Sequence, residues 1–140
     1  MYVVYFSSTG NTQAMAEAVG EGIKSAGKEA SVVDVSSISP SDLADESAFA
    51  LGCPAMGAEV LEEGTMEPFV TELEGSVSGK TIALFGSYDW GDGQWMRDWA
   101  ERMEGAGAKV LNGEGLICNL TPDDSALGEC KALGEQLARQ

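Results

Sequence analysis

The sequence predicts an α/β fold, a doubly wound parallel sheet of five strands with helices on both faces. Short apolar runs alternate with helical patterns from one end of the chain to the other, as in right-handed strand–helix–strand crossovers. No internal repeat or linker interrupts this alternation. A chain of 140 residues has the size of one domain, so we expect a single domain over residues 1–140.

The expected strands are short and rich in β-branched and aromatic residues. Tyr2–Phe6 is almost continuously apolar, which is typical of a parallel strand that is covered on both faces. The last strand is weaker and is divided into two pieces by a polar break. In chain order, the expected strands are Tyr2–Phe6, Ser31–Val35, Ala48–Cys53, Thr81–Phe85, and the interrupted pair Lys109–Leu111 and Gly115–Cys118.

Capping residues and apolar periodicity mark the expected helices. The first begins at about Asn11, and Gly27 is its C-terminal stop. The second begins with Thr65 as N-cap and Pro68 in its first turn, where a missing N–H does no harm. The further signals are Trp95, Trp99 and Met103 in a helix that ends near Gly105, the capping stretch Thr121–Asp124 before the last helix, and a short capped turn at Ser39–Asp42.

The composition excludes several classes of protein. The chain has no histidine, so it cannot form Ser-His-Asp or Cys-His catalytic groups, and it lacks the commonest metal ligand. Its three cysteines, Cys53, Cys118 and Cys130, show no Cys-x-x-Cys spacing, so we expect small apolar side chains rather than disulfides or a metal site. The N-terminus does not resemble a signal peptide and no apolar run could span a membrane, so we expect a cytoplasmic protein.

The formal net charge of −15 narrows the range of partners. It argues against nucleic acid, whose affinity for proteins comes mainly from Lys and Arg, and against anionic membrane surfaces. Between Lys28 and Lys80 the chain has eleven acidic residues and no Lys or Arg. This acidic stretch is a solvated face that keeps the protein soluble, or a docking surface for basic partners. The two interpretations are compatible.

Three loops are expected at the edge of the sheet where ligands bind. In a doubly wound sheet this edge is formed by the carboxyl ends of the strands, at the point where the strand order reverses. The loops are Ser7–Thr12, Pro54–Glu59 and Ser87–Gly93. The first places hydroxyls, an amide and a glycine at a helix N-terminus, which favours an anion such as phosphate. It is neither a Walker A loop nor Gly-x-Gly-x-x-Gly, so only neutral donors would hold that phosphate.

The other two loops offer groups that suit a flat heterocycle. Trp90 lies in a glycine-rich loop, where an exposed indole can stack on a conjugated ring. Met56 offers a polarizable side chain for the opposite face, and the Glu59 carboxylate can accept hydrogen bonds from a ring edge. The stretch Met56–Glu59 suggests a four-residue type II′ turn with Gly57 at its first central position, whose central peptide can flip. A single Met more often only packs in the core, but three converging loops favour a binding site.

These loops contain motifs that resemble a known family. Ser-x-Thr-Gly-Asn-Thr follows the first strand, Gly-Cys-Pro-Ala-Met-Gly-x-Glu the third, and Leu-Phe-Gly-Ser-Tyr-x-Trp-Gly-Asp-Gly lies at the fourth. With a fifth strand that no long insertion breaks, the whole chain resembles short-chain flavodoxins of the clostridial type. The resemblance implies a flavodoxin-like fold and a non-covalently bound FMN.

The resemblance also implies roles for single residues. Met56 and Trp90 would sandwich the isoalloxazine ring, Glu59 would accept from its pyrimidine N–H, and Asn119 would lie near the ribityl chain or ring. The hydroxyls and amide of the first loop would hold the phosphate, with Ser87 assisting. The complete set of cofactor-binding residues implied in this way is Ser7, Ser8, Thr9, Gly10, Asn11, Thr12, Pro54, Ala55, Met56, Gly57, Ala58, Glu59, Ser87, Tyr88, Asp89, Trp90, Gly91 and Asn119. Ser8, Ala58 and Asp89 depart from the pattern of the family, and Ala58 and Asp89 leave the redox tuning open.

The function implied is that of a low-potential one-electron carrier, not an enzyme. The acidity of the chain supports the low potential, because a second electron adds negative charge to a protein already at −15. The partners implied are FMN and, transiently, reductases and oxidases with basic surfaces, and we expect a monomer that binds neither nucleic acid nor membrane.

Two alternatives on the same fold stay open. The first is an FMN-dependent NAD(P)H:quinone reductase, although such enzymes typically need a nicotinamide site, more chain and a dimer interface. The second is the flavodoxin-like activator of ribonucleotide reductase, a redox carrier with one dedicated partner. A phosphotransfer receiver is excluded, because Cys53 stands where that class needs an aspartate.

Overall fold

The structure, a computed structural model, describes residues 1–140. Its strands are β1 (Tyr2–Tyr5), β2 (Ser31–Asp34), β3 (Ala48–Gly52), β4 (Thr81–Tyr88), β5 (Lys109–Val110) and β6 (Leu116–Asn119). Its α-helices are α1 (Asn11–Ser25), α2 (Met66–Leu73), α3 (Gln94–Gly105) and α4 (Asp124–Ala138). Short 3₁₀ turns are η1 (Val35–Ser37), η2 (Pro40–Leu43), η3 (Glu74–Ser76) and η4 (Leu111–Gly113).

The sheet is parallel throughout, with the strand order β2-β1-β3-β4-β5. Both β5 and β6 pair with β4, β5 near its start at Thr81 and β6 farther along, where Phe85 is opposite Leu116. The two pieces therefore share the fifth position of the sheet, with η4 between them. This arrangement confirms the predicted fold class and the interrupted fifth strand. The order reverses between β1 and β3, so the ligand edge lies at the carboxyl ends of these strands.

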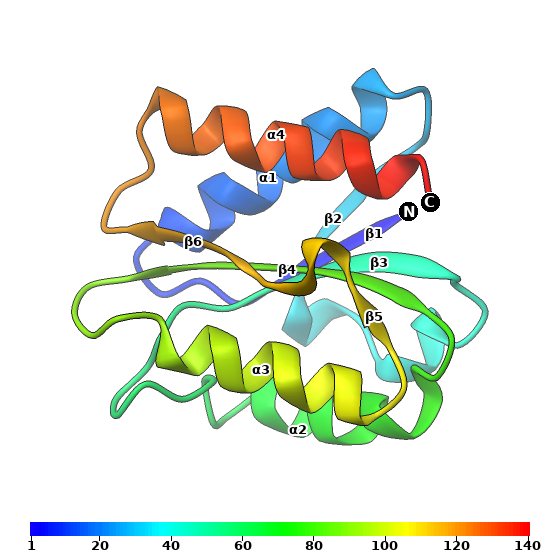
Figure 1. Ribbon diagram of the computed structural model, residues 1–140, viewed down its shortest axis with the longest axis horizontal. Helices are drawn as coiled ribbons and strands as arrows, with labels where there is room; N and C mark the ends of the chain where they lie inside the picture. The colour runs from blue at the N-terminus through cyan, green and yellow to red at the C-terminus, as the bar shows by residue number, and fades with distance from the viewer.

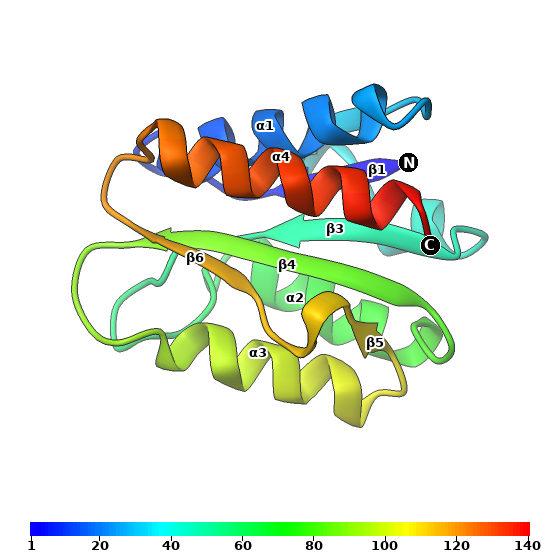
Figure 2. The same ribbon diagram turned by 45° about the horizontal axis from the view of Figure 1, so that its top comes forward.

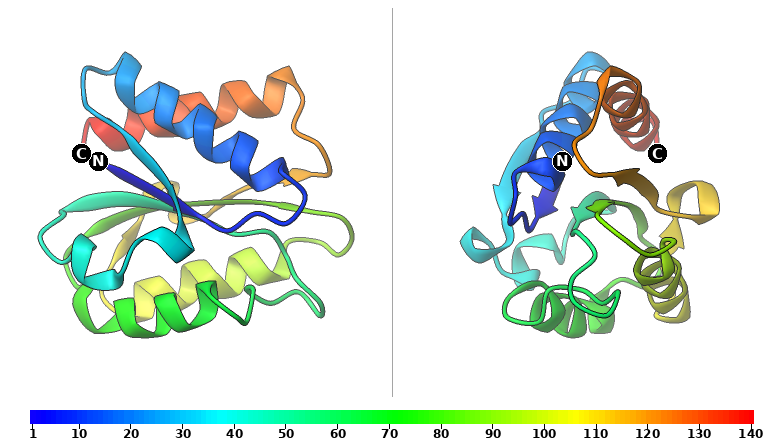
Figure 3. Two further views of the ribbon diagram at one scale, coloured as in Figure 1. Left: turned by 180° about the vertical axis from the view of Figure 1, so that it is seen from behind. Right: turned by 90° about the vertical axis from the view of Figure 1, so that its left-hand side faces the viewer.

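Helices cover both faces of the sheet (Figure 1). Helices α1 and α4 lie on one side, and α2 and α3 on the other, as the end view in Figure 3 shows. Neighbouring residues of one strand point to opposite faces, so Val3 packs under α1 and α4, whereas Val4 joins the core beneath α2 and α3. Both side chains are fully buried. Strands covered in this way are apolar in nearly every position, which explains the continuous runs in the sequence.

Helices α1 and α4 approach each other backbone to backbone, because a glycine on each faces the other helix. A Cβ on Gly22 would lie 1.9 Å from the carbonyl oxygen of Lys131, and one on Gly134 would lie 2.0 Å from that of Val19. No side chain fits at either position. This packing fixes α1, and with it the loop that precedes α1 at the ligand edge.

Some boundaries and caps differ from the sequence predictions. β1, β2 and β3 each end one residue earlier than predicted, whereas β4 continues to Tyr88 because it keeps pairing with β6. The cap of α2 is not the hydroxyl of Thr65 but the carboxylate of Glu62, which accepts from the N–H groups of Thr65 and Met66 at 2.8 and 2.9 Å. At α4, the capping side chain within the predicted stretch is Asp123, which accepts from Ala126 N–H at 2.8 Å.

The capped turn predicted at Ser39–Asp42 is present as η2, where the backbone N–H of Ser39 donates to the Asp42 carboxylate at 3.0 Å. All three cysteines are free, with Cys53 and Cys130 buried and Cys118 half-buried. None of the helices has the length and apolar character required to cross a membrane.

Candidate cofactor-binding site

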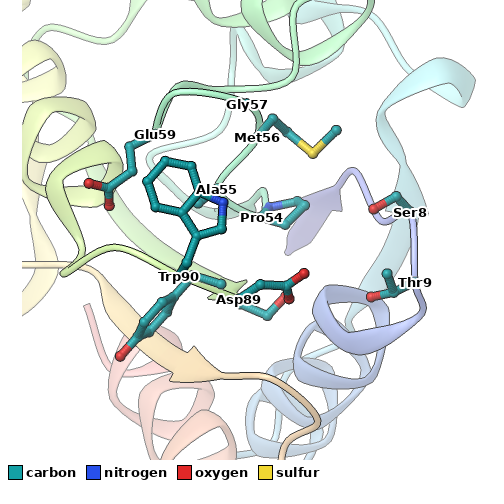
Figure 4. A pocket seen from close by; sticks show the side chains of 11 residues that line it. Ser8, Thr9, Pro54, Ala55, Met56, Gly57, Glu59, Asp89 and Trp90 are labelled. Atoms are coloured by element: carbon teal, nitrogen blue, oxygen red, sulfur yellow. The ribbon is translucent and has the colours of Figure 1, made fainter.

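A cleft of about 180 Å³ lies at the carboxyl ends of β1, β3 and β4, beside the reversal in strand order. All three loops predicted from the sequence contribute to it. Figure 4 shows Ser8 and Thr9 at one end of the cleft, and Glu59 and Trp90 toward the other. The residues that line the cleft are Ser8, Thr9, Pro54, Ala55, Met56, Gly57, Glu59, Ser87, Tyr88, Asp89 and Trp90.

The Ser8 end of the cleft adjoins the N-terminus of α1. Gly10 precedes the helix in the left-handed region, with φ of 93°, and has no side chain that could cap it. Ser7 supplies an acceptor instead, since its Oγ accepts from the backbone N–H groups of Gly10 and Gln13 at 3.1 and 3.2 Å. The first turn of α1 contains no acidic residue, so the positive end of the helix dipole favours an external anion.

A buried pair of hydroxyls ties α1 to the central strand. Thr12 Oγ1 and Ser87 Oγ lie 2.9 Å apart, and the backbone N–H of Ser87 donates to Thr12 Oγ1 at 3.3 Å. Both side chains are almost completely buried. Thr12 therefore lies behind the wall of the cleft, where it holds Ser87 in position, while Ser87 itself lines the cleft.

The second loop forms a small hairpin that differs from the predicted turn. Met56 and Val60 exchange two backbone hydrogen bonds of 2.9 and 3.0 Å, so the hairpin encloses three residues. The prediction of a four-residue turn over Met56–Glu59 was wrong, because closure at Val60 forms two backbone hydrogen bonds where a tight turn forms one. Gly57 and Glu59 both have positive φ, 49° and 55°.

The Glu59 carboxylate connects this hairpin to α3. Its Oε1 accepts from the backbone N–H groups of Gly93 and Gln94 at 3.2 and 3.0 Å, which satisfies donors at the start of α3. These bonds offset the strain of a non-glycine residue in the left-handed region. The carboxylate also fills the space beside Gly91, where a Cβ would lie 2.5 Å from Glu59 Cδ. Glu59 thus sets the distance between the second and third loops.

The third loop presents Trp90 to solvent. Its side chain is 63% exposed and lines the cleft, which is unusual for the largest apolar side chain. Asp89 points into the cleft beside it (Figure 4). Asn119 supports the loop from β6, since its Nδ2 donates to the carbonyl oxygens of Tyr88 and Asp89 at 3.1 and 3.4 Å.

A second tryptophan holds the strands beneath the cleft. Trp95 is 1% exposed, and its Nε1 donates to the Cys53 carbonyl oxygen at 3.1 Å. Its ring lies 5.6 Å from that of Tyr88, between centroids. Burial raises the pKa of the Cys53 thiol to about 12, so this cysteine stays protonated and does not act as a nucleophile or redox group.

Neutral groups and carboxylates surround the cleft, and no Lys or Arg lines it. The adjoining helix α3 contains Arg97 and Arg102. The guanidinium of Arg97 donates to the Asp92 carboxylate at 3.0 Å and to the Gln94 side chain at 2.9 Å, and that of Arg102 donates to the Glu67 carboxylate. An anion bound at the α1 end would therefore depend on hydroxyl and backbone N–H donors, as the sequence predicts.

The structure brings eleven of the predicted residues together in the cleft wall. The other predicted residues lie in the same loops or support them without lining the cleft; they are Ser7, Gly10, Asn11, Thr12, Ala58, Gly91 and Asn119. Two residues were not among the predicted binding residues: Val60, which closes the hairpin, and Gly93, which ends the third predicted loop and donates to Glu59. Leu120, which directly precedes the capping stretch Thr121–Asp124, was also not predicted; it is 52% exposed with φ of 59°, and its N–H donates to the Tyr88 carbonyl oxygen at 2.8 Å.

Comparison with known proteins agrees with this geometry. The model of the Flavodoxin family matches residues 3–134. The chain is 47% identical over 138 residues to a flavodoxin from Clostridium beijerinckii, with 99% of each chain covered. It is 44% identical over 137 residues to a flavodoxin from Megasphaera elsdenii, covering 98% of this chain and 97% of the relative.

The chain belongs to the flavodoxin family. The solution structure of two-electron reduced Megasphaera elsdenii flavodoxin superimposes with a TM-score of 0.88 at 42% identity, covering 99% of this chain and 98% of that one. Flavodoxins are electron-transfer proteins that bind FMN, so the family, the cofactor and the class of activity predicted from the sequence motifs are confirmed.

Proposed function

We propose that this flavodoxin binds one FMN non-covalently in the cleft and carries single electrons between redox proteins. The observation that supports this best is the pairing of two features in one cleft. One end adjoins a helix N-terminus with no acidic residue in its first turn, and the other presents a tryptophan that is 63% exposed. A ligand with a phosphate at one end and a flat ring at the other matches both.

The residues of the cleft fit FMN in chemistry, and the cleft is too small to enclose the whole ligand. A volume of about 180 Å³ is below the ~300–1,000 Å³ of pockets that enclose a small ligand, so part of the ring lies outside the cleft. Exposure of this kind suits an electron carrier, because a partner must approach the ring closely. The absence of Lys and Arg from the cleft leaves hydroxyls and N–H groups to hold the phosphate.

Bound FMN supplies the one-electron chemistry, and the chain binds and orients it. In this proposal Ser8 and Thr9 donate to the phosphate, and Met56 and Trp90 contact the two faces of the ring. Glu59 has one oxygen engaged by α3, which leaves its other oxygen for an N–H of the ring edge. Ser7, Thr12 and Asn119 position these groups through the hydrogen bonds described above.

The hairpin tip is the element that can respond to reduction. Nothing lies within 4 Å of a Cβ built on Gly57, so the tip of the hairpin stands in open space. In this proposal a rotation of the peptide between Gly57 and Ala58 would turn the Gly57 carbonyl oxygen toward the ring edge, where it would accept a hydrogen bond from a ring N–H. The net charge of −15 opposes a second electron and keeps its potential low.

The remaining properties of the carrier follow from its charge and from its fold. We propose that redox partners with basic surfaces bind it transiently, and that it remains a monomer because copies with a net charge of −15 repel each other. We place it in the cytoplasm, where free cysteines such as its three stay reduced. Residues 1–140 act as one domain in this proposal, since four helices cover one sheet.

The comparisons favour the electron carrier over the two alternatives, because flavodoxins cover the whole chain at 44–47% identity. A kinetic experiment separates the carrier from a quinone reductase. The FMN-loaded protein should oxidise NADPH at a negligible rate alone, and should pass electrons to a basic cytochrome once a separate flavin reductase is added. This transfer should slow as salt is raised from 10 to 500 mM, because screening shortens the reach of the acidic surface. Rapid NADPH oxidation without the reductase would contradict the proposal.

A further inference from the structure

A second hollow, larger than the cofactor cleft, runs along the free edge of the sheet. It is a groove of about 650 Å³ between α3 and the segment from Gly113 to Ile117. Figure 2 shows β5 and β6 along this edge, with α3 running beneath them. No residue in the groove except Gly93 contributes to the site described above.

The groove exists because the fifth strand is interrupted. The chain turns through Asn112 and Gly113, both in the left-handed region with φ of 67° and 74°, and then continues as β6. β6 pairs only with β4, so its outer backbone groups have no strand partner, which makes this edge a template for a further strand. Met96 packs directly against Gly115, since a Cβ there would lie 2.1 Å from Met96 Sδ.

The floor of the groove is apolar and its rim is acidic. Met96 and Ala100 form a closed surface, 3% and 5% exposed, and Ile117 is 36% exposed above them. The exposed carboxylates of Glu101, Glu104 and Glu114 line the rim, and none of them forms an ion pair. The guanidinium of Arg97 does not offset them, because it is bonded to Asp92. An apolar centre with a charged rim is the usual design of a protein-binding surface.

We propose that this groove docks an extended, basic segment of a redox partner. Lys or Arg side chains of the segment face Glu101, Glu104 and Glu114, its apolar side chains contact Ile117 above the closed floor, and its backbone pairs with the free edge of β6. The proposal rests on the proposed function, since it adds to an electron carrier a place where partners bind. Gly93 belongs both to the groove and to the loop that contains Trp90, so a docked partner is held beside the exposed side of the cofactor cleft.

Charge selects this occupant over a second copy of the chain. Two copies would each bring a net charge of −15 and three unpaired carboxylates to the same edge, and like charges across an interface are unfavourable. A basic segment removes that repulsion and satisfies the edge of β6 at the same time.

The test uses FMN-loaded protein and a synthetic peptide, acetyl-Gly-Lys-Ile-Lys-Val-Lys-Gly-amide, as the probe. Titration followed by ¹⁵N-NMR should shift backbone amides of the groove, such as Met96, Gly115 and Ile117, more than those of α1. The groove variant Glu101→Gln/Glu104→Gln/Glu114→Gln should weaken peptide binding about tenfold, which corresponds to three exposed ion pairs. The matched control Glu17→Gln/Glu21→Gln/Glu29→Gln removes the same charge from exposed positions elsewhere, and should change the affinity less than twofold.

The outcomes separate this inference from the proposed function. Equal weakening by both variants, or shifts spread over every acidic surface, would show that only net charge attracts the peptide and would overturn the docking groove. A dimer that sedimentation detects in the parent protein, and that the groove variant abolishes, would assign the groove to a second copy and also overturn it. FMN absorbance is recorded for each variant: protein that never takes up FMN contradicts the proposed function, whereas protein that binds FMN but not the peptide contradicts only the groove.

Discussion

Trp90 and Trp95 lie five positions apart, and the structure gives them opposite roles. Trp90 is 63% exposed on the rim of the cleft, whereas Trp95 is 1% exposed beneath it and donates to the Cys53 carbonyl oxygen. Trp90→Ala should therefore impair FMN binding, and Trp95→Ala should impair folding. The pair is a strict test, since both variants remove the same side chain.

The expected magnitudes follow from burial. Trp95→Ala leaves a cavity and an unpaired carbonyl, so the free energy of unfolding should fall by about 3–5 kcal/mol. Trp90→Ala changes an exposed position and should alter the stability of the FMN-free protein by less than about 0.5 kcal/mol. Loss of stacking on a flat ring costs about 1–3 kcal/mol, so its dissociation constant for FMN should rise about 5- to 150-fold.

Two measurements on FMN-free protein check this prediction. Urea denaturation gives the stability of each variant, and quenching of flavin fluorescence gives its affinity for FMN. Trp95→Phe is the control, because it keeps a ring in the core and should lose less stability than Trp95→Ala. If both alanine variants bind FMN equally weakly and are equally stable, the assignment of Trp90 to the ligand and of Trp95 to the core is wrong.

Three further predictions concern the hairpin, an ion pair and a carboxylate in the cleft. Gly57→Val places a β-branched side chain at φ of 49°, which costs about 1–2 kcal/mol. The potential of the first reduction step should therefore be lower in Gly57→Val than in Gly57→Asn, because Asn tolerates this region of φ. Equal potentials in the two variants would refute the role of the turn. The pKa of Glu67 is lowered mainly by the hydrogen bonds that its carboxylate accepts from Arg102. The pair therefore contributes its full stability at pH values above the pKa of Glu67 in the unfolded chain, ~4.3. This stability is lost as the pH falls through the pKa of Glu67 in the folded protein. Arg102→Met should therefore be less stable than the parent at pH 7, with the difference narrowing below about pH 4 in denaturation curves, and a difference that does not depend on pH would contradict the assignment. Asp89→Asn should raise the potential of the second reduction step by about 25 mV, the lower end for an exposed charge at ~7 Å, and potentiometry showing equal shifts in both steps would exclude a specific effect.

Much of the fold could be predicted because its signals are local. Buried parallel strands produce apolar runs, and the glycines and capping residues at Gly27, Gly105 and Asp123 end or begin helices within the same short window. Because ligands of doubly wound sheets bind at the carboxyl ends of the strands, the positions of the three loops in the sequence were enough to predict that they form one cleft. Residues such as Met56 and Trp90 were therefore predictable as neighbours.

The features that were missed depend on contacts between distant segments. The continuation of β4 through Ser87 requires pairing with β6, some 30 residues later, where Ser87 is opposite Cys118. Glu59 caps α3 from another loop, so no local capping signature marks it. The groove depends on Met96 packing over Gly115, and a glycine in a weak strand gives no sign of what covers it.

A reductive titration of the FMN-loaded protein decides whether this chain is a one-electron carrier. One FMN should bind per chain and should be reduced in two separate one-electron steps, with the second at a lower potential than in free FMN. Protein that does not bind FMN, or that takes up two electrons in a single step at the potential of free FMN, would contradict the account.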